Sequence, residues 1–143
     1  MAGGAPGLAR RIACAAYELL IVAALVMFAT FPYLAVAGDS TSGFRRHLLQ
    51  GWVLLVAGAY FVGFWARGGQ TLAMKTWRIR VEAADGGPVA PARALARYAL
   101  AVAGGALLGI GFLWAFLDRD RQFLHDRLAG TRLVDVRAAA APR

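Results

Sequence analysis

Three long apolar stretches limit the folds that are open to this chain. Residues 12–37 contain Glu18 as their only charged side chain, and residues 48–65 and 98–117 contain none. A hydrocarbon core about 30 Å thick requires roughly 20 apolar helical residues, so the first and third stretches are long enough and the second is just sufficient. A hydrophobic share of 59% among 143 residues agrees with this reading. We therefore predict an all-α integral membrane protein with two transmembrane helices and a third apolar segment.

The first stretch also imitates a cleavable signal peptide. Arg10 and Arg11 precede it, and the sequence "AVA" at residues 35–37 resembles a cleavage site. The apolar part of a signal peptide is about 7–15 residues long, whereas this run is much longer and contains an acid near its start. We interpret it as a retained transmembrane helix.

The third stretch can be arranged in two ways. A plain three-span chain places eight Lys and Arg residues on each side, which gives no orientation under the positive-inside rule. If residues 98–117 enter and leave on one side, fourteen basic residues share that side against two on the other. Four glycines in this stretch weaken a continuous helix, although glycines also serve close packing in ordinary spans. A full span and a glycine-broken re-entrant helix both stay open, and the second is favoured because it lets two polar strands meet.

Those strands are predicted in the polar loop, residues 66–97, and in the polar tail, residues 118–143. Residues 77–82 and 134–137 each alternate between apolar and charged side chains, which is the period-two pattern of a half-buried strand. We expect them to pair as a small two-stranded β element at the cytoplasmic face of one domain, residues 1–143.

Glu18 is the residue in the apolar stretches that most needs an explanation. A charged acid at the bilayer centre costs about 2.5–3.5 kcal/mol, so Glu18 should be protonated, paired or facing a wet cavity. Arg11, seven residues earlier, lies on nearly the same helix face and can extend towards the headgroups. Glu18 can serve as a structural lock or as a proton or cation site, and the residues alone weigh these two roles evenly.

Several classes of function lack support in the sequence. No hydrolase, zinc or nucleotide-binding motif is present, and the single cysteine excludes a disulfide, so we predict no enzyme, no cofactor and no metal site. The basic residues behind the net charge of +8 flank the apolar stretches, which indicates contact with anionic lipid headgroups of the bilayer and not with nucleic acid. His125 is expected to be a solvated side chain at the interface.

Three motifs give the chain a resemblance to a known family. They are "RRIACAAYE" at residues 10–18, "GQTLAMKTWRIRV" at residues 69–81 and "LHDRLAGTRLV" at residues 124–134. The chain resembles the RDD family of small bacterial membrane proteins, named for one arginine and two aspartates. The resemblance implies that the arginine is Arg11 and that the two aspartate positions fall at Glu18 and Asp126.

Two positions depart from the family pattern. Glu18 keeps the charge of an aspartate but lengthens the side chain by one methylene, and Ala73 stands where the family often has glycine. A site that requires tight aspartate geometry would be altered by the first of these changes.

The resemblance implies a part in the transport of a small solute or a cation, with proton coupling, and a polar cluster of Arg11, Glu18 and Asp126. So few spans cannot enclose a pathway, so we expect a homo-oligomer or a membrane partner protein, in the bacterial inner (cytoplasmic) membrane. The alternative is a non-transporting assembly or interaction factor of the membrane, in which the polar cluster is structural.

Overall fold

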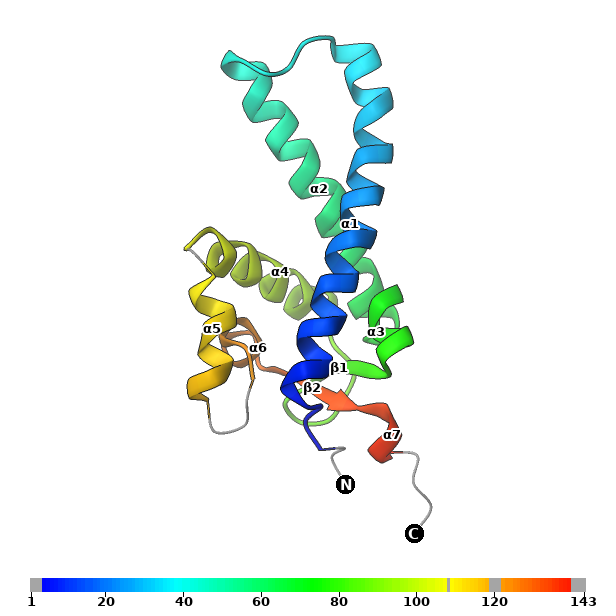
Figure 1. Ribbon diagram of the computed structural model, residues 1–143, viewed down its shortest axis with the longest axis vertical. Coiled ribbons are helices and arrows are strands. Elements are labelled where there is room, and N and C mark those ends of the chain that lie inside the picture. Colours follow the sequence, from blue (N-terminus) through cyan, green and yellow to red (C-terminus); the bar gives the residue numbers. More distant parts are fainter. Residues whose placement is uncertain (1–3, 108, 119–121, 140–143) are drawn as a thin grey trace.

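A long helical hairpin dominates the computed structural model, which describes residues 4–107, 109–118 and 122–139. The hairpin consists of α1 (Leu8–Ala37) and α2 (Gly43–Gly68), joined by a short loop at one end of the molecule (Figure 1). Both helices are long and apolar enough to cross a membrane, and no other helix in the described ranges passes this test.

The loop end of the hairpin exposes large apolar side chains. Phe28, Phe31 and Val36 of α1 are 82%, 78% and 91% exposed, and Phe44 at the start of α2 is 75% exposed. A contiguous apolar surface of this kind is unusual for a protein in water and marks contact with a membrane or another protein.

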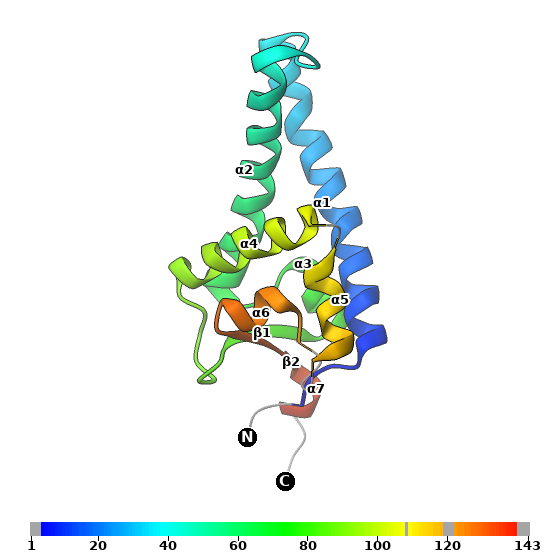
Figure 2. The same ribbon diagram turned by 90° about the vertical axis from the view of Figure 1, so that its left-hand side faces the viewer.

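Short elements gather around the other end of the hairpin. They are α3 (Leu72–Trp77), β1 (Ile79–Ala83), α4 (Pro91–Ala106), α5 (Ile110–Leu117), α6 (Leu124–Leu128), β2 (Thr131–Asp135) and α7 (Val136–Ala139). α4 lies at a steep angle to the hairpin, beside it in Figure 1 and across α2 in Figure 2, and α5 turns back towards the end that holds the two strands.

The third apolar stretch is broken, which confirms the glycine-broken form over a single continuous span. α4 ends at Ala106 and α5 begins at Ile110, with Gly109 in the left-handed conformation at φ 75°. α4, the first of these two helices, begins before the apolar stretch, inside the predicted polar loop at residues 66–97. Pro91 explains this start, because proline suits the first turn of a helix, where its missing N–H is not needed.

The two predicted strands do pair, and the sheet is antiparallel. Ile79 lies opposite Asp135, and Ala83 lies opposite Thr131. The predicted ends were wrong, because Trp77 belongs to α3 and Val136 begins α7. The apolar side chains of the sheet pack into a small core with residues of α2 and α4 among others; this core includes Trp65, Ile79, Val81, Ala94 and Leu133, each at most 4% exposed.

The N-terminal segment joins the same end of the molecule. The backbone N–H of Asp135 donates to the carbonyl of Gly4 at 3.1 Å, and the guanidinium of Arg10 pairs with the carboxylate of Asp135. Arg10 also donates to the backbone carbonyl of Trp77, so the start of α1 is tied to both polar segments. The N-terminal segment, the loop and the tail therefore share one end, as the fold-back arrangement requires.

Gly69 joins the end of α2 to the sheet and gives the first prediction. It has φ 70°, and a Cβ at this position would lie 2.4 Å from the backbone oxygen of Val81. Gly69→Ala is expected to lower the free energy of unfolding by about 2 kcal/mol or more, since the left-handed conformation alone costs a non-glycine residue about 1–2 kcal/mol. Thermal unfolding in detergent micelles measures the loss. Gly68→Ala is the matched control, because no atom lies within 4 Å of a Cβ there; an equal loss in both variants would contradict the steric argument.

Candidate functional site

A cavity of about 310 Å³ lies between α1, α2, α4, α6 and the sheet. Its wall is mostly apolar, and Ile79 and Leu133 of the two strands contribute to it. Arg, Glu and His side chains from three helices also line the cavity: Arg11, Glu18, Arg97 and His125. The cavity is the candidate site because it brings these four buried side chains of ionisable type to one place.

Glu18 is held by the segment that follows α2. Its side chain is 8% exposed, and its Oε2 accepts a hydrogen bond from the hydroxyl of Thr71, which is fully buried. The Thr71 Oγ1 in turn accepts from the N–H of Met74 at 3.3 Å and so caps the N-terminus of α3. The hydroxyl of Tyr60, which accepts from the N–H of Leu72 at 3.3 Å, also lies close enough to Glu18 to interact with it.

The second oxygen of Glu18 has a different environment. Within the described residues Oε1 is buried and has no hydrogen-bond donor. A buried polar atom without a partner normally costs about 1–3 kcal/mol, so most such atoms in folded proteins are paired. Glu18 therefore presents an unsatisfied acceptor at the cavity.

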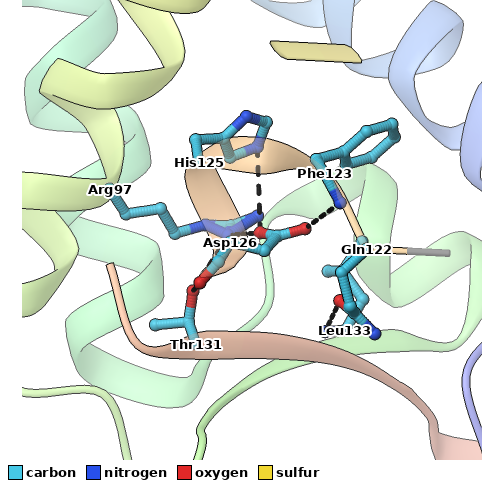
Figure 3. Close-up of polar contacts among 7 residues, drawn as sticks. All are labelled: Arg97, Gln122, Phe123, His125, Asp126, Thr131 and Leu133. Atoms are coloured by element: carbon cyan, nitrogen blue, oxygen red, sulfur yellow. Dashed lines mark hydrogen bonds and ion pairs between the residues drawn. The ribbon is translucent and has the colours of Figure 1, made fainter. Parts of the chain in front are cut away.

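Arg97 of the cavity wall forms a buried ion pair with Asp126, which lies behind that wall (Figure 3). Their side chains are 3% and 0% exposed, and the guanidinium also donates to Thr131 Oγ1 at 3.4 Å. The guanidinium stacks over the ring of Trp65 at 4.5 Å, a favourable cation–π geometry. The pair thus links α4, α6, β2 and α2.

Asp126 accepts two further hydrogen bonds, one from the N-cap residue of α6 and one from the first residue of β2. Its Oδ2 accepts from the N–H of Phe123 at 3.3 Å, and its backbone carbonyl accepts from the hydroxyl of Thr131 at 3.3 Å (Figure 3). A buried carboxylate with a paired cation and further donors can remain charged away from water.

His125 lies inside the protein, which corrects the expectation of a solvated interfacial side chain. It is 6% exposed, its ring stacks on Phe123 at a centroid distance of 5.4 Å, and its Nε2 is 3.7 Å from Asp126 Oδ1. Burial lowers the pKa of His125 from 6.5 to about 4, with Arg97 adding to the shift and Asp126 opposing it. The imidazole is therefore neutral at pH 7.

Arg10 and Arg11 diverge at the start of α1. Arg10 pairs with Asp135 outside the cavity, whereas the side chain of Arg11 is 2% exposed and lines the cavity wall with Glu18. The expectation that Arg11 extends to the headgroups is therefore wrong. Its inward position comes from the packing of α1 against α3 and the core, which covers the face that carries Arg11, Cys14 and Glu18.

The predicted polar cluster is present in an altered form. Arg11 and Glu18 share the cavity, while Asp126 lies behind it and meets the cavity through Arg97 and His125. Within the described ranges no three His, Cys, Asp or Glu side chains come together as a group that could hold a metal ion.

Arg97 and Thr71 were not predicted as site residues from the sequence. Thr71 had a usable signal, because it stands in the motif at residues 69–81, whose hydrogen bonds the structure now explains. In the same motif Ala73 is fully buried, which accounts for the small residue there. Arg97 had no comparable signal, since it lies just before an apolar run and its partner is 29 residues away.

The comparisons with known proteins agree with the three motifs. The model of the RDD family matches residues 5–130, which include every side chain of the cavity except Leu133. No curated protein and no solved structure gives a significant match. A match over this share of the chain shows that it belongs to the RDD family.

Proposed function

We propose that this chain is a multi-pass protein of the bacterial inner membrane that takes part in the transport of a small solute or a cation, with protons exchanged at Glu18. The family and the two apolar helices indicate a membrane protein. The fourteen basic residues in the N-terminal segment, the loop and the tail favour a cytoplasmic location for the end that holds the sheet.

The depth of Glu18 supports such a role. Residues 19–37 of α1 rise by about 28 Å at roughly 1.5 Å per residue, which nearly matches a hydrocarbon core of about 30 Å. If this section crosses the hydrocarbon, Glu18 lies at its cytoplasmic boundary. A carboxylate at that depth can exchange protons with water at a lower cost than one at the bilayer centre.

The single observation that carries the proposal is the unsatisfied Oε1 of Glu18 at the cavity. Thr71 satisfies only the other oxygen. A proton on the carboxyl group, or a cation or donor group of a solute beside it, would supply the missing partner. Glu18 is thus suited to alternate between two occupants, which is the requirement for coupling a solute to protons.

The shape of the cavity favours a second subunit or a membrane partner. Its wall includes Leu19 of α1 and Val102 of α4, which are 70% and 37% exposed. A subunit that packed between these helices would close the cavity laterally and complete a pathway that two spans cannot enclose. This geometry supports the proposal that the protein transports as a homo-oligomer or together with a partner membrane protein.

The test is proton movement across a sealed membrane. Purified protein is reconstituted into liposomes that contain a pH-sensitive dye and is then exposed to sodium, lithium or potassium gradients. The wild type is expected to change the internal pH with at least one cation. Glu18→Gln is expected to reduce the rate by about tenfold or more, because glutamine cannot titrate and still fits the space. Glu18→Asp is expected to retain flux with a shifted pH dependence.

The matched control is Glu82→Gln. Glu82 is a partly exposed acid of β1 outside the cavity, 3.7 Å from Arg132, and its replacement is expected to leave the flux unchanged. Equal flux from wild type and Glu18→Gln, or no flux from reconstituted wild type under any gradient, would overturn the proposal.

A second candidate function is a membrane assembly or interaction factor. The observation that favours it is the Arg97–Asp126 pair, which is buried, bonded on several sides and tied to four elements, as a structural lock would be. Under this alternative, Glu18→Gln retains full function and the wild type moves no cations. The liposome experiment therefore separates the two candidates.

A further inference from the structure

Two adjoining hollows form a groove on the outside of α2 and α3, away from the cavity. They measure about 260 and 280 Å³ and share Gln70 and Lys75 in their walls. The first is lined mainly by the last turns of α2, and the second by Arg78 and the start of α7. In Figure 1 α3 and α7 lie on the same side of the molecule, one above the other.

The hollow beside α7 is strongly cationic. Lys75, Arg78 and Arg137 line it, all three are exposed, and no ion pair involving any of them is present in the described part of the chain. Asp135 lies beside Arg137 and accepts its backbone N–H at 2.9 Å, but the carboxylate of Asp135 is paired with the guanidinium of Arg10. An anion placed between Lys75, Arg78 and Arg137 would therefore meet three positively charged side chains that form no salt bridge among the described residues.

The backbone at Arg78 helps to assemble this charge. Arg78 has φ 54° and ψ 46°, a left-handed conformation that few residues other than glycine adopt, and its N–H donates to the carbonyl of Lys75 at 3.3 Å. This turn ends α3 abruptly and starts β1, so that Arg78 follows Lys75 within one turn and faces the same hollow.

The hollow beside α2 is apolar on one side, although Arg67 and Lys75 line its other side. Ala59, Gly63 and Phe64 form the apolar wall, and a Cβ on Gly63 would meet no atom within 4 Å, so the surface there is open. Lys75 Nζ lies 5.7 Å from the centroid of the Phe64 ring, at the junction between the apolar wall and the cationic hollow. The groove therefore has an apolar wall at its α2 end and positively charged side chains at its α7 end.

We propose that this groove binds one anionic phospholipid. Its phosphate contacts Lys75, Arg78 and Arg137, and an acyl chain lies along Ala59 and Gly63 of α2. The order of the surfaces matches the order of the groups in a lipid, since the apolar wall belongs to a candidate membrane helix and the cations lie beyond its end. A free phosphate ion would bind only in the cationic hollow and would make no contact with the apolar wall. The proposal requires membrane insertion of α2 and is independent of transport.

The experiment is lipid retention by the full chain in detergent micelles, measured by native mass spectrometry. Phosphatidylglycerol and phosphatidylcholine with identical acyl chains are added at equal concentration, and soluble glycerol phosphate is added as a competitor. Phosphatidylglycerol is expected to be retained about tenfold more than phosphatidylcholine, because Lys and Arg side chains beside the membrane attract anionic headgroups. Glycerol phosphate is expected not to displace it.

Two variants locate the site. Replacing Lys75, Arg78 and Arg137 together by glutamine is expected to remove the preference for phosphatidylglycerol, whereas the same change at Arg45, Arg46 and Arg93 keeps it. Gly63→Leu fills the apolar wall and is expected to weaken retention of the lipid without altering the protein's thermal stability.

Three results from the wild type and the triple variants would each overturn the proposal. They are equal retention of the two lipids by the wild type, equal loss of preference in the two triple variants, and displacement of the lipid by glycerol phosphate. The Gly63→Leu variant keeps the test valid if the cationic variant does not fold, because unchanged retention in that variant also overturns it.

Discussion

Replacing Asp126 with asparagine is expected to lower the free energy of unfolding by about 3–5 kcal/mol, because it leaves the buried guanidinium of Arg97 without a compensating charge. Asparagine keeps the size of the side chain, so the loss reports the charge and not a cavity. Chemical denaturation in mixed micelles measures it. The double variant Arg97→Met with Asp126→Leu removes both charges together and is expected to lose less than Asp126→Asn alone.

The matched control uses an ion pair that is not buried. Arg132 and Glu82 are 3.7 Å apart and 31% and 24% exposed, so Glu82→Gln is expected to change the free energy of unfolding by less than about 1 kcal/mol. If Asp126→Asn stayed within that same range, Arg97 would have another source of compensation and the pair would not be a structural lock.

The helical hairpin could be predicted from the sequence because apolar runs of sufficient length constrain the chain locally. Glu18 did not obscure the first run, and the hairpin loop at residues 38–42 contains ordinary turn formers. The pairing of the strands could also be predicted, since two alternating segments were the only partners available to one another. The exact ends of the strands could not be predicted, because Thr71 caps α3 and this helix extends to Trp77.

The partners inside the site could not be predicted from the sequence. Arg10 and Arg11 are adjacent basic residues, and only the packing of α1 decides which of them faces the cavity. Arg97 reaches Asp126 because the third apolar stretch folds back between them, and that break was one of two open arrangements. Both outcomes depend on tertiary contacts between residues far apart in the chain.

The two long family motifs meet at the cavity from opposite sides. The motif at residues 69–81 supplies Thr71, which fixes one oxygen of Glu18. The motif at residues 124–134 supplies His125 to the cavity wall, and Asp126, which holds Arg97 in that wall. These roles give a physical reason why the two motifs occur together with an acid on the first helix.

Acidification from pH 7 to pH 4 is expected to destabilise the protein through His125. The pKa of His125 is about 4 in the folded protein and 6.5 when the side chain is freely solvated. Between these values the unfolded chain binds more protons than the folded one, so stability is full above pH 6.5 and falls as the pH drops towards 4. The full difference corresponds to about 3 kcal/mol.

Thermal unfolding in detergent micelles at pH 7.5, 6.5, 5.5 and 4.5 measures this loss. The series begins about one pH unit above the ordinary pKa of histidine and extends below it. His125→Gln removes the titrating group, so the fall in unfolding temperature between the extremes should shrink in this variant, although other acids still titrate. His47→Gln is the matched control, because His47 is exposed at the start of α2 and should leave the pH profile of the wild type unchanged. A His125→Gln variant whose unfolding temperature fell as steeply as that of the wild type would show that the buried imidazole takes up its proton without opening the packing between Phe123, Asp126 and Arg97.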